Sequence, residues 1–227
     1  MNKITYLDGA RWHRALVAGA SNVLSRQEYL NKINVFPVPD GDTGTNMAFT
    51  LTSILDSTEQ KIHPRSDEML ALIADAALDG ARGNSGVILA QFFQGLSDGA
   101  AGVEKMTPEN FAKAVQFGAE YARQALAEPI EGTMLTVLTD FSNHLIELIE
   151  SQHYDFEHLL EMGINEAEKS LENTPNLLAV LKKAGVVDAG AQGFVDLLNG
   201  IFSFVRDGDL HGFKIDLEKK ETTLNLI

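Results

Sequence analysis

The apolar residues of this 227-residue chain recur mostly at every third or fourth position, which is the spacing of one face of an α-helix. Alternation typical of a strand occurs only at residues 213–217, in a charged and weakly patterned tail. The pattern predicts an all-α bundle of eight or nine helices joined by short links. The expected helices cover residues 8–31, 45–56, 66–80, 87–96, 108–126, 133–151, 155–171 and 194–205, with a shorter one from Thr174-Pro175 to just before Gly185.

Local signals indicate where several of these helices begin and end. Asp8 is available as the N-cap of the first helix, and Ser66 is expected to cap the third. Thr107-Pro108 is a typical helix entrance, because proline is well tolerated at the first helical position. Pro129 is expected to close the helix that follows.

Glycine-rich segments precede three of the predicted helices, at residues 41–44, 80–86 and 185–193. Glycine lets the backbone approach a ligand closely, and a helix N-terminus carries free N–H groups and a positive dipole end. Such helix starts favour phosphate groups.

The segment 34–47 brings two carboxylates, Asp40 and Asp42, close to the first of these helix starts. Pro37 and Pro39 restrict the backbone before them, so the chain is expected to reach Asp40 straight and with little freedom. Carboxylates at this spacing indicate a Mg²⁺ site, whose remaining ligands would be phosphate oxygens and water. A solvated Asp-Gly turn is the alternative interpretation.

Three familiar motifs do not account for this loop. An EF-hand begun at Asp40 would require Gly at position 45 and Glu at position 51, where the chain has Thr45 and Leu51. A Walker A loop needs Gly-Lys followed by Ser or Thr, and the sequence has no such triplet. An aspartyl-phosphate phosphatase would place its Asp after an apolar strand, which Pro37 and Pro39 would break.

Composition limits the other function classes. The formal net charge of −14 argues against a nucleic-acid partner, because phosphate-backbone binding needs a basic surface. The chain lacks cysteine, so disulfides and thiolate metal sites are excluded. No signal peptide or membrane-length apolar run is present, and we expect a cytoplasmic protein without a transmembrane segment. Its length suits one sizeable core.

Four motifs in order resemble the DhaL-type (DAK2) nucleotide-binding domain, in the version found in bacterial fatty acid kinases. They are the aspartate loop, Gly80-Ala-Arg-Gly-Asn-Ser-Gly-Val87, Pro129-Ile-Glu-Gly-Thr-Met-Leu-Thr136, and residues 173–181 with 184–193. The resemblance covers most of residues 5–205. It implies a closed barrel of about eight antiparallel helices with the nucleotide at one end, a domain at 1–206, and a tail or linker at 207–227.

The resemblance also implies roles for the matched residues. Asp40 and Asp42 would be the catalytic metal ligands, and Asn34 stands near the place of a further family aspartate. For segment 43–46 the alternative is a plain helix start capped by Thr43 or Thr45, and for segment 84–86 it is a structural helix cap. The implied contacts to ATP or ADP are Thr43, Gly44, Thr45, Asn46, Asn84, Ser85, Gly86, Gly132, Thr133, Met134, Asp188, Ala189 and Gly190.

The activity implied is an ATP-Mg²⁺ phosphotransferase, with two ions expected, that converts a fatty acid on an acyl-binding partner protein into an acyl phosphate. Two alternatives are a dihydroxyacetone kinase subunit and a nucleotide-binding regulatory module without turnover. Thr43 stands where dihydroxyacetone kinases have His, and the family's nucleotide-contacting Arg has no counterpart at 173–180. Dimerisation through a C-terminal region beyond this chain is a further expectation.

Overall fold

The computed structural model describes residues 4–207, in which the chain forms ten α-helices and one isolated antiparallel bridge between Leu7 and Met106. The all-α class is therefore confirmed. The helices are α1 (Gly9–Ser25), α2 (Gln27–Lys32), α3 (Thr43–Gln60), α4 (Ser66–Gly80), α5 (Gly83–Gly99), α6 (Pro108–Gln124), α7 (Met134–Ser151), α8 (Phe156–Leu177), α9 (Ala179–Ala184) and α10 (Ala189–Asp207).

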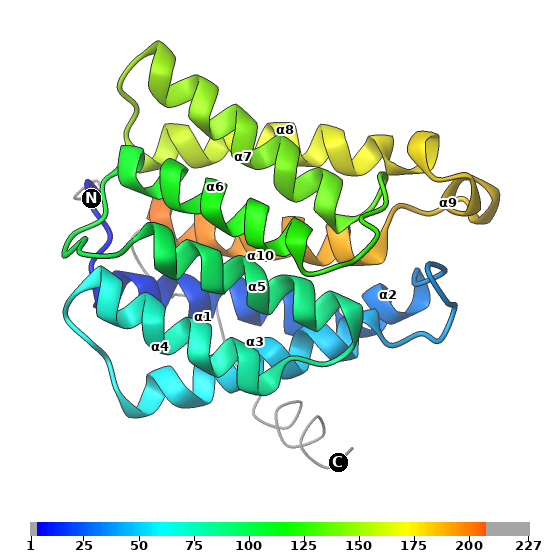
Figure 1. Ribbon diagram of the computed structural model, residues 1–227, viewed down its shortest axis with the longest axis horizontal. Coiled ribbons are helices and arrows are strands. Elements are labelled where there is room, and N and C mark those ends of the chain that lie inside the picture. Colours follow the sequence, from blue (N-terminus) through cyan, green and yellow to red (C-terminus); the bar gives the residue numbers. More distant parts are fainter. Residues whose placement is uncertain (1–3, 208–227) are drawn as a thin grey trace.

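Eight long helices form a closed ring. Each packs on the next in the order α1, α3, α4, α5, α6, α7, α8, α10, and α10 returns to α1. Consecutive members run in opposite directions, and the short helices α2 and α9 are both at one end of the ring, at the right of Figure 1. The ring matches the expected closed antiparallel barrel.

The core is built from the inner faces of this ring. Phe194 of α10 makes edge-to-face contacts with Phe92 of α5 and Phe141 of α7, with ring centroids 5.5 and 5.8 Å apart. Phe141 and Phe194 are fully buried, as is Trp12 of α1. Burial of each such side chain stabilises the fold by roughly 1.5–3 kcal/mol. The apolar spacing of three or four residues therefore fixes which face each helix turns inward.

The seam between α1 and α10 depends on close backbone approach. A Cβ on Gly200 would lie 2.5 Å from the Ala18 carbonyl oxygen, and one on Gly19 would lie 2.8 Å from a Leu197 methyl group. Larger side chains at these positions would push the two helices apart and open the ring.

Some predicted boundaries were wrong for identifiable reasons. The first helix breaks at Arg26, so α1 and α2 replace one helix over 8–31. Ser66 is not the cap of α4, because Arg65 takes the cap position and the Ser66 hydroxyl donates to the Leu7 carbonyl at 2.6 Å. The helix before Pro129 already ends at Gln124.

Pro175 does not start a helix but lies in the last turn of α8. A proline there cannot donate the usual hydrogen bond to the carbonyl four residues earlier, which belongs to Leu171. The Thr174 hydroxyl donates to that carbonyl instead, at 2.8 Å. The missing backbone bond is thus replaced, and the helix continues to Leu177.

The remaining predictions concern helix caps, the C-terminal tail and membrane-spanning segments. The Asp8 cap is confirmed, since its carboxylate accepts from the Arg11 N–H at 2.9 Å. Thr107 likewise caps α6. The alternating stretch 213–217 and nearly all of the predicted tail lie outside the described residues. Within residues 4–207, none of the helices has both the length and the apolar character needed to cross a bilayer.

Because the ring alternates in direction, four helices begin at the same end of the molecule. These are α3, α5, α7 and α10, whose first residues lie at the right of Figure 1. The end that collects four helix N-termini is also the end where the predicted motifs meet.

Candidate functional site

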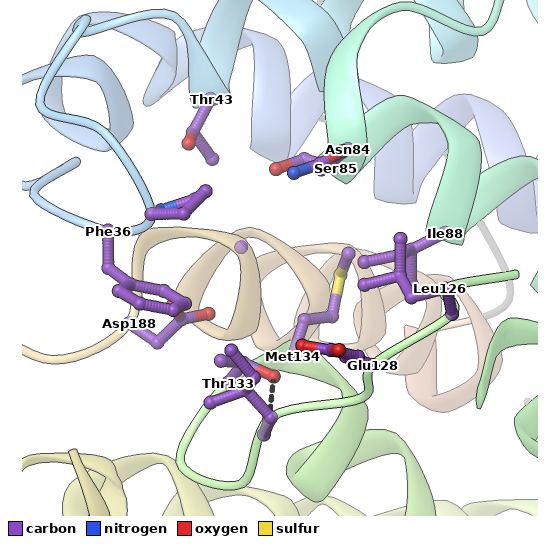
Figure 2. A pocket seen from close by; sticks show the side chains of 14 residues that line it. Phe36, Thr43, Asn84, Ser85, Ile88, Leu126, Glu128, Thr133, Met134 and Asp188 are labelled. Carbon is purple, nitrogen blue, oxygen red and sulfur yellow. Dashed lines mark hydrogen bonds between the residues drawn. The ribbon is translucent and has the colours of Figure 1, made fainter.

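A pocket of about 250 Å³ opens at this end of the ring. Figure 2 shows its lining side chains converging from α3, α5, α7, the start of α10, and the loops before α3 and between α6 and α7. The lining consists of Phe36, Pro37, Thr43, Asn84, Ser85, Ile88, Leu126, Ala127, Glu128, Ile130, Thr133, Met134, Asp188 and Gly190.

Seven of the residues predicted from sequence line this pocket, although they come from four separate stretches of chain. Their shared feature is position, since each stands at or near the first turn of a helix. The pocket wall is therefore rich in backbone N–H groups and positive dipole ends, which favour an anionic ligand. These seven are Thr43, Asn84, Ser85, Thr133, Met134, Asp188 and Gly190.

The Asp188 carboxylate accepts hydrogen bonds from backbone N–H groups at two of the four helix N-termini. It accepts from the Ala191 N–H at 2.9 Å, and also from the N–H groups of Gly190 in α10 and Met134 in α7. Burial raises the pKa of Asp188 to about 6, and these three hydrogen bonds oppose that rise. The N-termini of α7 and α10 thus already face a negative charge.

The starts of α3 and α5 are arranged differently. Their cap positions are occupied by Asp42 and Arg82, and neither side chain makes a capping hydrogen bond. In the pocket wall the N-terminal dipoles of these two helices face Thr43, Asn84 and Ser85, and the Asp42 carboxylate at the start of α3 accepts no hydrogen bond from that helix. Phosphate groups are therefore best accommodated on the α3 and α5 side of the pocket.

Asn31 of α2 caps α3 from outside the helix. The Thr45 N–H donates to Asn31 Oδ1 at 3.1 Å, and Asn31 Nδ2 donates to Thr45 Oγ1 at 3.0 Å. Gln27 Nε2 also donates to that hydroxyl, at 3.2 Å. Thr45, a predicted nucleotide contact, thus joins α3 to α2, and neither Thr43 nor Thr45 is the helix cap predicted from the sequence.

The aspartate loop curls around Asn34, so the expected straight approach to Asp40 was wrong. Asn34 Nδ2 donates to the carbonyls of Phe36 and Val38 at 3.2 and 3.4 Å, and Asn34 Oδ1 accepts from the Asp42 N–H at 3.2 Å. One buried amide thereby fixes both ends of the loop. Its Oδ1 is engaged with the backbone, and its role as a metal ligand stays a prediction.

The carboxylates of Asp40 and Asp42 remain uncommitted. Across residues 4–207 neither accepts a hydrogen bond or forms an ion pair, although Asp42 stands at a position where aspartate usually caps its own helix. Two hard oxygen donors on a partly exposed loop suit Mg²⁺. No group of three His, Cys, Asp or Glu side chains gathers in the described part, so phosphate and water would complete the shell.

The other predicted contacts serve as packing positions around the pocket. A Cβ on Gly44 would lie 2.2 Å from the Gln27 carbonyl oxygen, and one on Gly86 would lie 2.9 Å from Thr50 Oγ1. Asn46 packs its amide against Gly83. These residues set how closely α2, α3 and α5 approach.

Gly132 and Ala189 support the remaining wall. Gly132 has φ of +82°, a left-handed conformation that favours glycine, and its N–H donates to Thr136 Oγ1 at 2.9 Å. Ala189 is buried at the first position of α10. Direct contact of these residues with a nucleotide remains a prediction.

Sequence reasoning missed the apolar wall of the pocket. Half of the lining residues were not predicted as ligand contacts. These residues come from the loop before α3, from α5, and from the connection at 125–133 that follows α6. Leu126, Ala127 and Glu128 stand outside the four motifs, and loop residues without helical spacing gave no signal. Phe36, Pro37 and Ile130 lie within motifs and Ile88 within a predicted helix, but no ligand contact was predicted for any of them. The missed residues are Phe36, Pro37, Ile88, Leu126, Ala127, Glu128 and Ile130.

An ion-pair network holds the 125–133 connection in place. Arg123 donates to Glu131 at 2.7 Å, and the Thr136 hydroxyl donates to the second Glu131 oxygen at 2.7 Å. The hydrogen bond from Thr136, followed by the one from Arg123, lowers the pKa of Glu131 below its ordinary value. The connection is therefore anchored at α6 and α7 while its middle forms pocket wall.

Comparison with solved structures supports the same fold. The native dihydroxyacetone kinase of C. freundii superposes with a TM-score of 0.66 at 19% identity, over 89% of this chain and 36% of that one. The same enzyme in complex with AMP-PNP and Mg²⁺ gives 0.65 at 19% identity, over 88% and 35%. At this identity the likeness shows the fold alone.

Sequence comparison identifies the family. Uncharacterized proteins of Staphylococcus saprophyticus and Staphylococcus epidermidis are 38% and 39% identical over 203 and 197 residues, covering 89% and 87% of this chain. One from Staphylococcus aureus is 37% identical over 218 residues. The chain spans about two fifths of the length of these relatives, at 37%, 36% and 40%. A family model described as the DAK2 domain matches residues 37–203, and the chain therefore belongs to the DAK2 domain family.

Proposed function

We propose that this pocket binds ATP or ADP with Mg²⁺, and that the chain is the phosphotransferase domain of a fatty acid kinase. The observation that carries the nucleotide proposal is the contrast between the helix starts. Asp188 neutralises those of α7 and α10, whereas the cap side chains of α3 and α5, Asp42 and Arg82, leave theirs without a capping hydrogen bond. This arrangement suits a polyphosphate bridged to the protein by a divalent cation.

Each group has a definable task in this proposal. Thr43, Asn84 and Ser85 bind the phosphate chain with the N-termini of α3 and α5. Asp40 and Asp42 hold the metal, for which two ions are proposed, and Asn34 keeps their loop in shape. Bound Mg²⁺ would neutralise phosphate charge, so that the protein's contribution is positioning.

The fatty acid proposal rests on the sequence motifs that resemble fatty acid kinases, together with the chemistry of the acceptor. A carboxylate oxygen would attack the γ-phosphorus, the bond to the β,γ-bridging oxygen would break, and acyl phosphate and ADP would form. A fatty acid is ionised at neutral pH, so no general base has to remove a proton. The uncommitted aspartates are then needed only for metal.

A partner protein is part of this proposal, because a fatty acid must be presented with its carboxylate at the pocket mouth. The structurally similar C. freundii enzyme is a dihydroxyacetone kinase, so dihydroxyacetone is the comparison acceptor. Its hydroxyl would need a base. Thr43 at the position of the family's histidine counts against that acceptor.

Two measurements test the proposal in order. Calorimetry should show ATP binding with Mg²⁺ and none in excess EDTA, because the acidic loop repels bare polyphosphate. Phosphate transfer from labelled ATP is then measured with fatty acid on its acyl-binding protein, and in parallel with dihydroxyacetone on its carrier subunit. Equal ATP binding in EDTA contradicts the metal bridge, and transfer to dihydroxyacetone alone contradicts the fatty acid assignment.

A further inference from the structure

Glu128 is an acidic residue of the pocket wall with no structural task. Within residues 4–207 its carboxylate takes part in no hydrogen bond or ion pair. The other two acids of this region are committed, Asp188 to backbone N–H groups and Glu131 to Arg123 and Thr136. An unpartnered carboxylate facing a pocket is available to a ligand.

The position of Glu128 separates two regions of the pocket. Figure 2 shows Glu128 beside Thr133 and Met134, across the pocket from Thr43 and the pair Asn84 and Ser85. A carboxylate without a metal repels phosphate, so the phosphate chain belongs on the far side, where the N-termini of α3 and α5 and the proposed Mg²⁺ offset its charge. The Glu128 side is left for the uncharged part of the ligand.

The surroundings of Glu128 suit a nucleoside. Leu126, Ile88 and Met134 contribute apolar surface to this half of the pocket, as Figure 2 shows, and Phe36 faces them from the aspartate loop. A planar base gains from such surface, while its N–H groups and the ribose hydroxyls need acceptors. Within the described lining, Glu128 is the carboxylate free to accept.

We propose that Glu128 determines nucleoside specificity by accepting a hydrogen bond from a ribose hydroxyl or from the exocyclic amine of the base. This inference rests on the proposed nucleotide site and names a further residue of it. It orients the nucleotide, with its phosphates at α3 and α5 and its nucleoside at the 125–133 connection.

The connection that carries Glu128 is preorganised for this role. Glu131 ties it to Arg123 and Thr136, and the Thr133 hydroxyl donates to the Ile130 carbonyl at 2.7 Å. These bonds anchor the connection on the C-terminal side of Glu128 without using its carboxylate. Glu128 itself is exposed at the pocket wall. A positioned acceptor discriminates, because an analogue without the matching donor leaves that acceptor unpaired in the complex.

The test is calorimetry of the 227-residue chain with Mg²⁺ and four nucleotides: ATP, 2′-deoxy-ATP, 3′-deoxy-ATP and ITP. The deoxy analogues lack one ribose donor each, and ITP lacks the exocyclic amine. Wild type should bind at least one analogue about tenfold more weakly than ATP. Glu128→Ala should bring ATP to the affinity of that analogue, and Glu128→Gln should fall between.

Glu161→Gln is the matched control, since Glu161 is exposed near the start of α8, at the opposite end of the ring, and has no partner in the described part. It removes the same charge and should leave every affinity unchanged. Discrimination that persists in Glu128→Ala, or a wild type that binds all four nucleotides alike, overturns the role of Glu128 while the nucleotide site stands. Failure of wild type to bind Mg-ATP overturns the proposed function itself.

Discussion

Asn31 and Thr45 form a reciprocal pair across two helices: the Thr45 N–H donates to Asn31 Oδ1 at 3.1 Å, and Asn31 Nδ2 donates to Thr45 Oγ1 at 3.0 Å. Asn31 thereby satisfies an N–H in the first turn of α3 that Asp42 could have satisfied. The consequence is an aspartate at a cap position with its carboxylate free. An amide twelve residues before Thr43 thus contributes to the proposed metal site.

Asn31→Ala should destabilise the protein and weaken Mg-ATP binding together. Loss of a helix cap costs about 0.5–2 kcal/mol, and the unsatisfied start of α3 would draw Asp42 back into capping. Urea denaturation measures the first effect and calorimetry the second. Asn31→Asp keeps the acceptor but not the donor, so it should retain much of the stability; equal loss in both variants would contradict the capping role.

Asp40→Ala and Asp42→Ala should each abolish Mg-ATP binding without lowering the stability of the apo protein. Neither carboxylate has a partner in residues 4–207, and two nearby negative charges repel each other in the absence of metal. Thermal melts with and without Mg-ATP separate these effects, because a ligand raises the melting temperature only where its site survives. Variants that melt early yet keep the ligand shift would make the aspartates structural.

Ser85→Ala should affect mainly ATP binding, whereas Gly86→Val should affect mainly the stability of the fold. Ser85 lines the pocket, so its loss should weaken ATP binding several-fold with little change in stability. A Cβ on Gly86 would lie 2.9 Å from Thr50 Oγ1 and 3.2 Å from the Asn46 carbonyl oxygen, so valine should force α5 away from α3. Overpacking costs about 1–3 kcal/mol, measurable by denaturation; a normally stable Gly86→Val variant would contradict this packing.

The pH dependence of stability should reflect Asp188. Burial raises its pKa to about 6 from 3.8, so between these values the folded state holds a proton that the unfolded state has lost. The contribution of this carboxyl is fully present below pH about 4 and is lost as pH rises through about 6, an effect of roughly 3 kcal/mol.

Asp188→Asn tests directly whether the stability contribution of Asp188 decreases as pH rises. The variant cannot ionise, so its stability relative to wild type should improve as pH rises from 4 to 7. Denaturant titrations at several pH values measure the difference, and Glu161→Gln provides the control for a surface charge. A constant difference across this range would show that Asp188 has the same pKa folded and unfolded.

The sequence predicts the ring more completely than the pocket. Inner faces follow from apolar spacing, because residues such as Phe141 and Phe194 recur at helical intervals and become buried. The break at Arg26 and the continuation of α8 through Pro175 depend on local hydrogen bonds that spacing does not encode.

The residues of the candidate site likewise divide into those that the sequence predicts and those that it does not. Thr43, Ser85 and Asp188 could be found, since glycine-rich helix starts have a recognisable composition. Glu128 could not, because a glutamate in a loop is usually solvated and only the anchoring of its neighbours turns it into pocket wall. The capping by Asn31 was equally invisible, because it joins side chain and backbone across two helices.

The closure of the ring by its first and last helices has a consequence for synthesis. Helix α10 packs between α1 and α8, so the seam that Gly19 and Gly200 make close joins the two ends of the described chain. A ribosome-bound chain cannot complete this ring until residue 207 has emerged, and contacts so distant in sequence slow folding. Asp188 arrives with the same helix, so the growing chain acquires its ligand pocket and its closed fold in a single late step.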